Sequence, residues 1–167
     1  GRDSDINSCS IGIEIVNGGH DYGLPDFPPE QIDAVIALCK DIATRWSIPP
    51  HRILAHSDTA PARKADPGEK FPWHRLAHEG VGHFVTPAPL SDGLSFARGA
   101  EGPPVQALQA MLSLYGYALP VTGVFDEATE QTVTAFQRHF RPARIDGIAD
   151  LSTIKTLRDL IAALPAA

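Results

Sequence analysis

Apolar residues repeat at two different spacings in the first half of the chain, and these spacings predict a strand, a helix and a second strand. Isoleucines alternate with other residues over 11–16, which predicts a strand that projects Glu14 away from the isoleucines. Apolar residues recur every three or four positions over 28–46, which predicts an amphipathic helix with Trp46 in the core. Residues 52–55 predict a short second strand. This order favours an α/β unit, a mixed sheet with flanking helices, whose site lies at strand ends.

The last third of the chain has a helical spacing throughout. Residues 101–164 predict three helices separated by turns that contain glycine, and therefore a small three-helix, all-α domain. Two of the turns are similar, because Gly123–Asp126 and Asp146–Asp150 each lead into a helix and are each followed by a threonine, Thr129 or Thr153. The similarity indicates a weak internal repeat.

A proline-rich segment separates the two patterns. Residues 86–93 combine prolines with small and polar residues, which is typical of an extended linker. We therefore expect part of a first domain over 1–85, a linker over 86–100 and a helical domain over 101–167.

The composition excludes several classes of protein. The net charge of −6 leaves no basic excess to neutralise phosphates, so nucleic acid is not an expected partner. No apolar run is long enough to span a membrane. Cys9 and Cys39 are too few for a disulfide scaffold; Cys39 is expected as a buried thiol, and a bond between the two is left open.

The segment from His56 to Trp73 is dense in polar groups and has neither a helical nor a strand period. A long irregular segment of this kind is costly to order unless it builds a site. His56 and Asp66 are candidate zinc ligands, because catalytic zinc takes imidazole nitrogen and carboxylate oxygen as ligands and usually has three protein ligands. The alternatives are a histidine satisfied by a neighbouring backbone group and an aspartate in an ordinary Asp-Pro-Gly turn.

Four ordered motifs carry a family resemblance: Ser10–Glu14, Ala55–Asp58, Ala60–Gly68 and Phe71–Trp73. With these motifs the first domain resembles the zinc-dependent N-acetylmuramoyl-L-alanine amidases, which form the type-2 amidase family. The nearest resemblance is to the cell-envelope branch, which carries a C-terminal peptidoglycan-binding domain. The resemblance implies that His56 and Asp66 bind zinc, that Glu14 is the catalytic acid/base and that Lys64 stabilises the developing charge.

Two further residues are candidates for substrate binding, and the resemblance also implies a third zinc ligand. Arg63 is expected to hold a stem-peptide carboxylate and Trp73 to line the groove; a solvated arginine and a core tryptophan are the alternatives. The third ligand of the family is a histidine before the Ser10–Glu14 motif, and no histidine of this chain stands there. Because the chain begins at Gly1, we expect it to be the C-terminal part of the amidase domain, with the third ligand supplied by a bound N-terminal fragment or with an incomplete zinc site.

The second domain resembles the peptidoglycan-binding domain found beside many cell-wall hydrolases. The motifs that carry this resemblance span most of the second domain: Val105–Gln109, Gly116–Tyr117, Gly123–Phe125, Ala135–Gln137 and Asp146–Gly147. Asp126 stands where the family commonly has glycine. Phe136 in a helix core and Gln137 on the surface are the alternatives to sugar contact.

Together the two resemblances imply an enzyme that hydrolyses the amide bond between N-acetylmuramic acid and L-alanine. The expected partners are peptidoglycan or muropeptides, and the protein is otherwise expected to be a monomer. The expected location is the periplasm or cell envelope, with membrane anchoring of the full-length protein left open. The alternative is a non-catalytic peptidoglycan-recognition protein, or an inactive fragment that lacks a zinc ligand.

Overall fold

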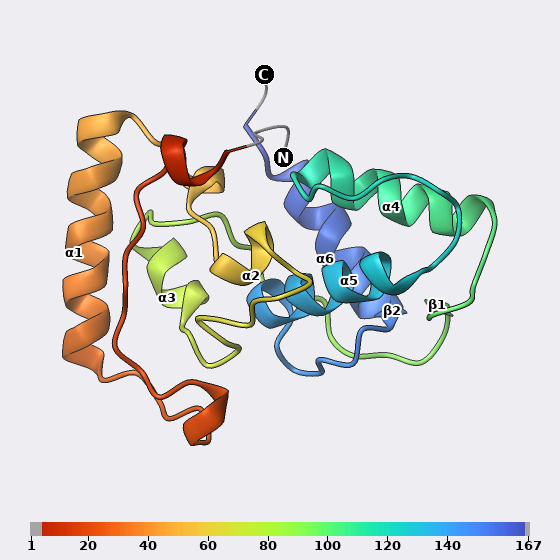
Figure 1. Cartoon of the computed structure of the whole chain (residues 1–167), viewed down its shortest axis with the longest axis horizontal. Coiled ribbons are helices and arrows are strands. Elements are labelled where there is room, and N and C mark those ends of the chain that lie inside the picture. The colour runs from red at the N-terminus through yellow and green to blue at the C-terminus, as the bar shows by residue number, and fades with distance from the viewer. Residues whose placement is uncertain (1–4, 166–167) are drawn as a thin grey trace.

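The computed structural model describes residues 5–165, which form two parts placed side by side (Figure 1). The first part contains helices α1, α2 and α3 joined by long extended segments, and the second contains α4, α5, α6 and two very short strands. The bounds are α1 Pro29–Trp46, α2 His56–Thr59, α3 Trp73–His78, β1 Ser95–Phe96, α4 Pro103–Tyr115, α5 Glu127–Phe140, β2 Ala149–Asp150 and α6 Leu151–Ala162.

Helix α1 confirms the predicted amphipathic helix. Pro29 occupies its first turn, where a missing N–H costs nothing, and the stripe that it buries consists of Ile32, Val35, Ile36 and Cys39. The prediction that Trp46 lies in the core is wrong, since its side chain is 69% exposed. Burial decreases along the helix beyond Cys39, so the last turn of α1 lies past the segments that cover the rest of its apolar face.

The mixed sheet expected in the first part is not formed within residues 5–85. Residues 11–16 are extended but have no strand partner, and Pro50–Arg52 is a 3-10 turn rather than the start of a strand. An extended segment becomes a strand only when a neighbouring segment hydrogen bonds to it, and no described segment of this chain pairs with either one. Instead, extended segments pack on a core built by α1, α3 and the loop between α2 and α3.

The second part packs α4, α5 and α6 around a core of its own. That core is rich in fully buried side chains, among them Val105, Phe125, Phe136 and Leu157. The part is not purely helical, because β1 pairs antiparallel with β2, with Ser95 opposite Asp150. Phe136 is buried, which confirms its interpretation as a core residue.

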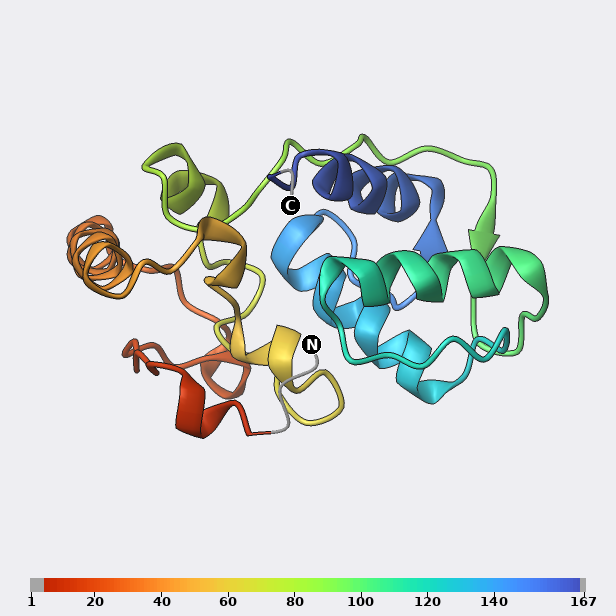
Figure 2. The same cartoon turned by 90° about the horizontal axis from the view of Figure 1, so that it is seen from above.

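The linker lies along α6 rather than extending freely between the two parts (Figure 2). The Ala88 amide donates a hydrogen bond to the Thr156 hydroxyl at 3.0 Å, and the Ser152 hydroxyl donates to the Ala88 carbonyl at 2.6 Å. Phe84 and Val85, just before it, pack against the core of the second part. The linker is therefore part of that second packing unit.

Two buried glutamines make equivalent contacts, which shows that the predicted internal repeat is also present in the three-dimensional structure. The side-chain carbonyl of each accepts two successive backbone N–H groups of the following turn, and its amide donates to the next backbone carbonyl. These partners are Thr122, Gly123 and Val124 for Gln109, and Asp146, Gly147 and Ile148 for Gln137. The interpretation of Gln137 as a surface residue is wrong: it is 0% exposed, because the turn folds over its amide.

Each repeat then begins its helix with an aspartate cap. Asp126 accepts hydrogen bonds from the backbone N–H and the hydroxyl of Thr129, and Asp150 does the same with Thr153. A side-chain oxygen at this position satisfies an N–H that the helix itself cannot pair. Asp126 therefore caps the N-terminus of α5.

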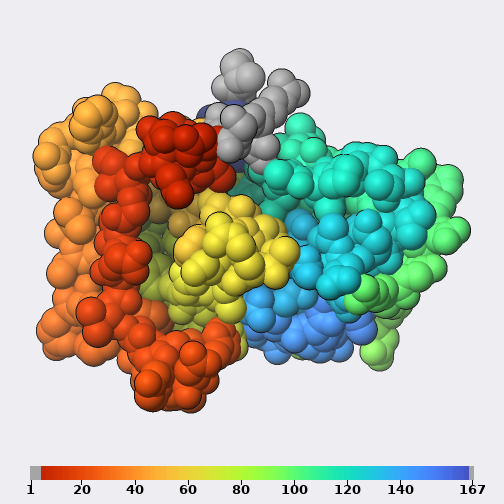
Figure 3. Space-filling view, in the orientation of Figure 1, coloured from red at the N-terminus to blue at the C-terminus, as the bar shows by residue number. Residues whose placement is uncertain are grey.

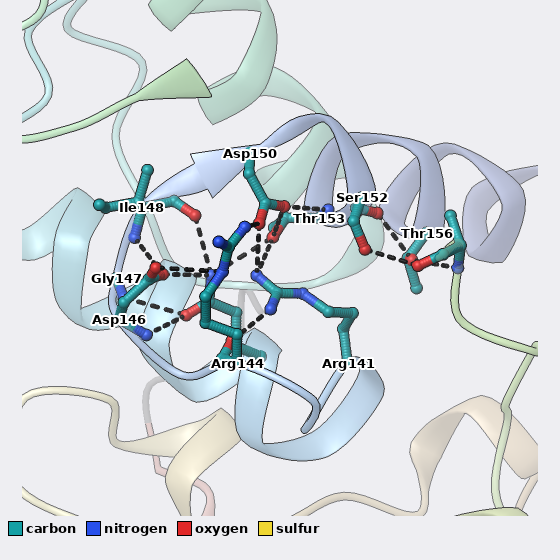
Figure 4. A network of polar contacts seen from close by, with 11 residues as sticks. Arg141, Arg144, Asp146, Gly147, Ile148, Asp150, Ser152, Thr153 and Thr156 are labelled. Atoms are coloured by element: carbon teal, nitrogen blue, oxygen red, sulfur yellow. Dashed lines mark hydrogen bonds and ion pairs between the residues drawn. The ribbon is translucent and has the colours of Figure 1, made fainter. Parts of the chain in front are cut away.

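A buried arginine network surrounds the second cap (Figure 4). The Arg141 guanidinium donates to the Thr153 hydroxyl at 2.6 Å and to Asp150 Oδ2 at 3.2 Å, and it also contacts the Arg144 carbonyl. Arg144 makes a further ion pair with Asp150. Burial lowers the pKa of Arg141, opposed by the charge of Asp150. The network ties the end of α5 to the start of α6.

Acid is expected to destabilise the protein through Asp150. Burial raises the pKa of this carboxyl, but hydrogen bonds from Thr153 and Arg144 together outweigh burial, so the pKa lies below its ordinary value of 3.8. The stability that it contributes is present above that ordinary value and is lost as the pH falls through the lower folded pKa. Urea unfolding between pH 7 and pH 3 should therefore show a weaker acid dependence for Asp150→Asn than for the wild type. Equal dependence in the two proteins would contradict the assignment.

The two cysteines are free thiols in different surroundings. Cys39 is buried, as expected, and neither it nor the exposed Cys9 is in a disulfide. Among residues 5–165, no helix combines the length and the apolar character needed to cross a membrane.

Candidate functional site

His56 begins α2, a helix of only four residues at the boundary between the two parts (Figures 1 and 2). The backbone N–H of Ala55 donates to Asp58 Oδ2 at 2.9 Å, which caps the start of the turn, and the Ala60 N–H donates to the His56 carbonyl. Ala55 and Ser57 on either side are buried, whereas the imidazole of His56 is exposed. The short helix therefore presents His56 to solvent from an anchored backbone.

The loop after α2 returns Asp66 to His56. The Ser57 N–H donates to the Asp66 carbonyl at 3.1 Å, and His56 Nδ1 lies 2.9 Å from Asp66 Oδ2. The two side chains are 44% and 59% exposed, respectively. The structure thus brings together the two residues that the sequence analysis assigned as metal ligands, ten positions apart, on an open surface.

Lys64 and Arg63 lie on the tip of the same loop. Their backbone N–H groups both donate to the Ala60 carbonyl, at 3.0 and 3.1 Å, which forms a tight turn. Lys64 is half-buried and Arg63 exposed. Within the described residues, neither side chain has a hydrogen bond or ion pair, so both cations are free to meet an anionic ligand.

Glu14 lies on the extended segment that passes in front of α1. Ile13 and Ile15 are half-buried against the core of the first part, and Glu14 between them is exposed. This alternation is the one that the sequence predicted, although the segment has no strand partner. Among the residues described, no side chain pairs with the Glu14 carboxylate.

Trp73 lies in the core beneath this loop. It is 6% exposed, and its ring packs between Phe71, with centroids 4.7 Å apart, and His139, at 3.9 Å. This is the core packing that the sequence left open as the alternative to lining a groove. The role of Trp73 in substrate binding stays a prediction, and its side chain exposes little surface that a substrate could contact.

Sequence reasoning missed three residues beside the site. Asp58 Oδ1 accepts a hydrogen bond from the Tyr117 hydroxyl at 2.7 Å, and Asp58 Oδ2 lies 2.6 Å from His139 Nδ1. Tyr117 follows α4 and His139 lies on α5, so both belong to the second part. Their distance from Asp58 along the chain, 59 and 81 positions, left no local pattern that could have revealed them.

An open cavity lies between Pro61 of this loop and α5. It has a volume of about 280 Å³ and is lined by Pro61 of the loop and by Glu127, Glu130, Gln131, Thr134 and Arg138 of α5. In the space-filling view the loop, coloured yellow, stands at the surface between the two parts (Figure 3). The polar surface of α5 therefore adjoins the loop at Pro61.

The donor set of the His56–Asp66 pair fits zinc. In a tetrahedral site with bonds of about 2.0–2.2 Å, two nitrogen or oxygen ligands lie about 3.4 Å apart. The His56 and Asp66 atoms are 2.9 Å apart, so a small side-chain rotation provides that separation. Among residues 5–165 no third histidine, cysteine or carboxylate joins them in a metal-binding cluster. The described part of the chain thus supplies two of the usual three ligands.

Each part of the chain is similar to a known family. Residues 1–69 match the family model described as N-acetylmuramoyl-L-alanine amidase, and residues 101–157 match that of the peptidoglycan binding domain. The N-acetylmuramoyl-L-alanine amidase AmiD of Escherichia coli is 39% identical over 158 residues, which are 89% of this chain and 55% of that protein. The 1,6-anhydro-N-acetylmuramyl-L-alanine amidase AmpD of Enterobacter cloacae is 36% identical over 70 residues, 42% of this chain and 35% of that protein. The chain therefore spans about half or less of the length of these relatives.

Two solved structures are similar to this one. Escherichia coli AmiD, in complex with anhydro-N-acetylmuramic acid-L-Ala-D-gamma-Glu-L-Lys, has a TM-score of 0.68 and 32% identity, covering 83% of this chain and 54% of that one. AmpDh3 from Pseudomonas aeruginosa, in complex with anhydromuramic pentapeptide, has a TM-score of 0.72 and 36% identity, covering 86% of this chain and 56% of that one. The arrangement of the described residues is therefore shared with amidase structures.

Proposed function

Because residues 1–69 match the N-acetylmuramoyl-L-alanine amidase family and residues 101–157 match the peptidoglycan-binding family, we propose that the protein hydrolyses the amide bond between N-acetylmuramic acid and L-alanine in peptidoglycan. The observation that carries the proposal is the approach of His56 and Asp66 to 2.9 Å on an exposed loop within the amidase segment. The muropeptide ligands of the two similar structures support the substrate class.

His56 and Asp66 are the residues that would hold zinc in this chain. Zinc bound there would polarise a water molecule and lower its pKa, so that the water attacks the amide carbon at neutral pH. Their exposed side chains leave the ion accessible to a polymeric substrate. A third protein ligand comes, in this proposal, from outside residues 5–165, for example from a bound N-terminal fragment.

Glu14 and Lys64 carry the proton transfer and the charge stabilisation in this mechanism. Glu14 accepts the proton of the attacking water and later delivers it to the leaving amine of L-alanine. Lys64 places its ammonium near the oxygen on which negative charge develops. Support comes from the exposure of Glu14 and from the absence of any described partner that would neutralise either side chain. Arg63 binds a carboxylate of the stem peptide through its two-pronged guanidinium.

The proposed division of the chain is an amidase segment over 1–85, a linker over 86–100 and a peptidoglycan-binding domain over 101–167. Two separate hydrophobic cores support the division. In the complete amidase fold, the extended segment that carries Glu14 would be a strand of a mixed sheet. Action on peptidoglycan implies the periplasm or cell envelope as its location.

A non-catalytic peptidoglycan-recognition protein is the second candidate function. The observation that favours it is that residues 5–165 contain two metal-ligand candidates in contact rather than three. Such a protein would bind muropeptides through the same surface without hydrolysing them. Such a protein would have no use for a carboxylate at Glu14 and an ammonium at Lys64 that are both without a partner among the described residues.

The test of the proposed function combines mass, metal and activity on the purified protein. Intact mass under native and denaturing conditions reveals any second polypeptide, and elemental analysis gives the zinc content. We expect about one zinc per protein and release of L-alanine-terminated peptide from muropeptides. Muropeptide binding without hydrolysis, in protein that contains no zinc, would establish the recognition function instead.

Replacing Lys64 by Met is expected to lower the turnover number by about 10²–10³-fold, the usual effect of removing one group that stabilises a developing oxyanion. Zinc content should be unchanged, because the substitution leaves His56 and Asp66 in place. Steady-state hydrolysis of a muropeptide measures the effect, with Lys155→Met on the exposed face of α6 as the matched control. Full activity of Lys64→Met would contradict the proposal that Lys64 stabilises the developing charge.

A further inference from the structure

The Asp58 carboxylate is buried at the junction of the two parts, where three donors satisfy it. The Ala55 N–H donates from its own helix at 2.9 Å, while the Tyr117 hydroxyl at 2.7 Å and His139 Nδ1 at 2.6 Å come from the second part. A carboxylate can only accept, so His139 carries its proton on Nδ1. The Asp58 and His139 side chains are 6% and 2% exposed. Two of the three donors that stabilise this buried charge thus belong to the peptidoglycan-binding unit.

The rings around His139 leave its imidazole little freedom. Its ring stacks on that of Trp73 with centroids 3.9 Å apart and on that of Phe140 at 3.7 Å. Tyr117 is also buried. Its burial, and after that the nearby charge of Asp58, raise the pKa of the Tyr117 hydroxyl well above the ordinary value, so the hydroxyl keeps its proton and remains a donor. Stacked and buried groups hold their positions more firmly than exposed ones. Both donors are therefore a rigid support for Asp58.

Asp58 passes this constraint to the candidate metal ligands through the backbone. It lies on the same four-residue helix as His56, and it caps the N–H of Ala55, the residue before His56. The next residue of that helix, Ser57, donates from its backbone to the Asp66 carbonyl. An isolated turn of four residues is unstable without such tertiary support. A fixed Asp58 therefore holds the backbone from which both His56 and Asp66 project.

A second contact joins the same loop to α5. Glu69 lies shortly after Asp66, and its Oε2 is 3.0 Å from His20 Nε2 and 4.0 Å from Arg138 Nε. Arg138 precedes His139 on α5, so two neighbouring side chains of α5 approach carboxylates at the two ends of segment 58–69. The loop is supported by α5 at two places.

We propose that Tyr117 and His139 of the peptidoglycan-binding unit are positioning residues for the His56–Asp66 pair. This inference rests on the proposed function, in which that pair holds zinc. The second unit then does more than attach the enzyme to the cell wall, because it completes the support of the metal site. Loss of either donor leaves the Asp58 charge undersatisfied, and α2 moves to reach water.

The test uses Tyr117→Phe, which removes only the hydroxyl, and His139→Ala with His139→Asn beside it. The asparagine amide N–H₂ can take the place of Nδ1–H, so Asn should restore what Ala loses. The first readout is zinc affinity by competition with a chelator, and the second is hydrogen exchange of the backbone over 56–66 in zinc-free protein. We expect zinc affinity to fall about 10- to 100-fold, as for other supporting partners of metal ligands, with faster exchange over 56–66.

Thr153→Ala is the control for a general loss of stability in the second unit. It weakens the cap of α6, and no described contact joins Thr153 to α2. Unchanged zinc affinity and exchange in Tyr117→Phe and His139→Ala would overturn the inference, as would an equal effect of Thr153→Ala. Wild-type protein that binds no zinc would instead refute the proposed function. The exchange measurement, which needs no zinc, would then still decide whether the second unit holds the loop.

Discussion

Replacing Glu14 by Gln is expected to lower the rate of muropeptide hydrolysis by about 10²–10⁴-fold, the range found when a general acid/base is lost. The amide has nearly the shape of the carboxylate but cannot accept the proton of the attacking water. Glu14 is exposed, and no described residue pairs with it, so the substitution should not affect folding. The rate is measured by the appearance of the free amine of L-alanine.

Zinc content and a matched variant decide how this result is interpreted. Glu14→Gln should retain as much zinc as the wild type, because the candidate ligands His56 and Asp66 lie on a different segment. Glu30→Gln on the exposed first turn of α1 removes one carboxylate elsewhere and should leave the rate unchanged. An active Glu14→Gln enzyme would assign the proton transfer to another residue.

Replacing Arg141 by Met is expected to lower the free energy of unfolding by about 3–5 kcal/mol, the usual cost of removing one partner of a buried ion pair. The guanidinium is 0% exposed and contacts Asp150, Thr153 and the Arg144 carbonyl at once. Without it, buried acceptors at the α5–α6 connection lose their donor. Methionine fills much of the volume, so the loss reports on the hydrogen bonds rather than on a cavity.

Two further variants separate this effect from a general loss of charge. Arg158→Met removes an exposed arginine whose only ion-pair partner within residues 5–165 is its neighbour Asp159, and it should change the unfolding free energy by less than about 0.5 kcal/mol. Adding Asp150→Asn to Arg141→Met removes a buried charge that has lost one of its two arginine partners, and it should recover part of the loss. Urea unfolding measures all three. A cost for Arg141→Met as small as for Arg158→Met would mean that the network does not stabilise the fold.

The helices and the internal repeat could be predicted from the sequence because they depend on local interactions. The apolar stripe of α1 follows a period that any helix must have, and the Asp126–Thr129 and Asp150–Thr153 caps join residues three positions apart. The candidate ligands His56 and Asp66 could also be found, since a short irregular loop contains both.

Burial was less predictable than secondary structure. Trp46 follows the helical period and yet is exposed, because no segment among residues 5–165 covers it at the last turn of α1. Gln137 is polar and yet fully buried, because the repeat folds a turn over its amide, whose hydrogen bonds are all satisfied there. In both cases the type of residue was a poor guide to the surroundings that packing creates.

The sequence by itself determined where the helices lie, which short segment carries the candidate zinc ligands and which families the two parts resemble. These properties depend on patterns among residues that lie close together in the sequence. Only the tertiary structure decided that 11–16 finds no strand partner within the described chain, and that Asp58 of the first part is held by Tyr117 and His139 of the second. The physical reason is that pairing between distant segments depends on how the whole chain packs, and separations of 59 and 81 residues leave no periodic trace in the sequence.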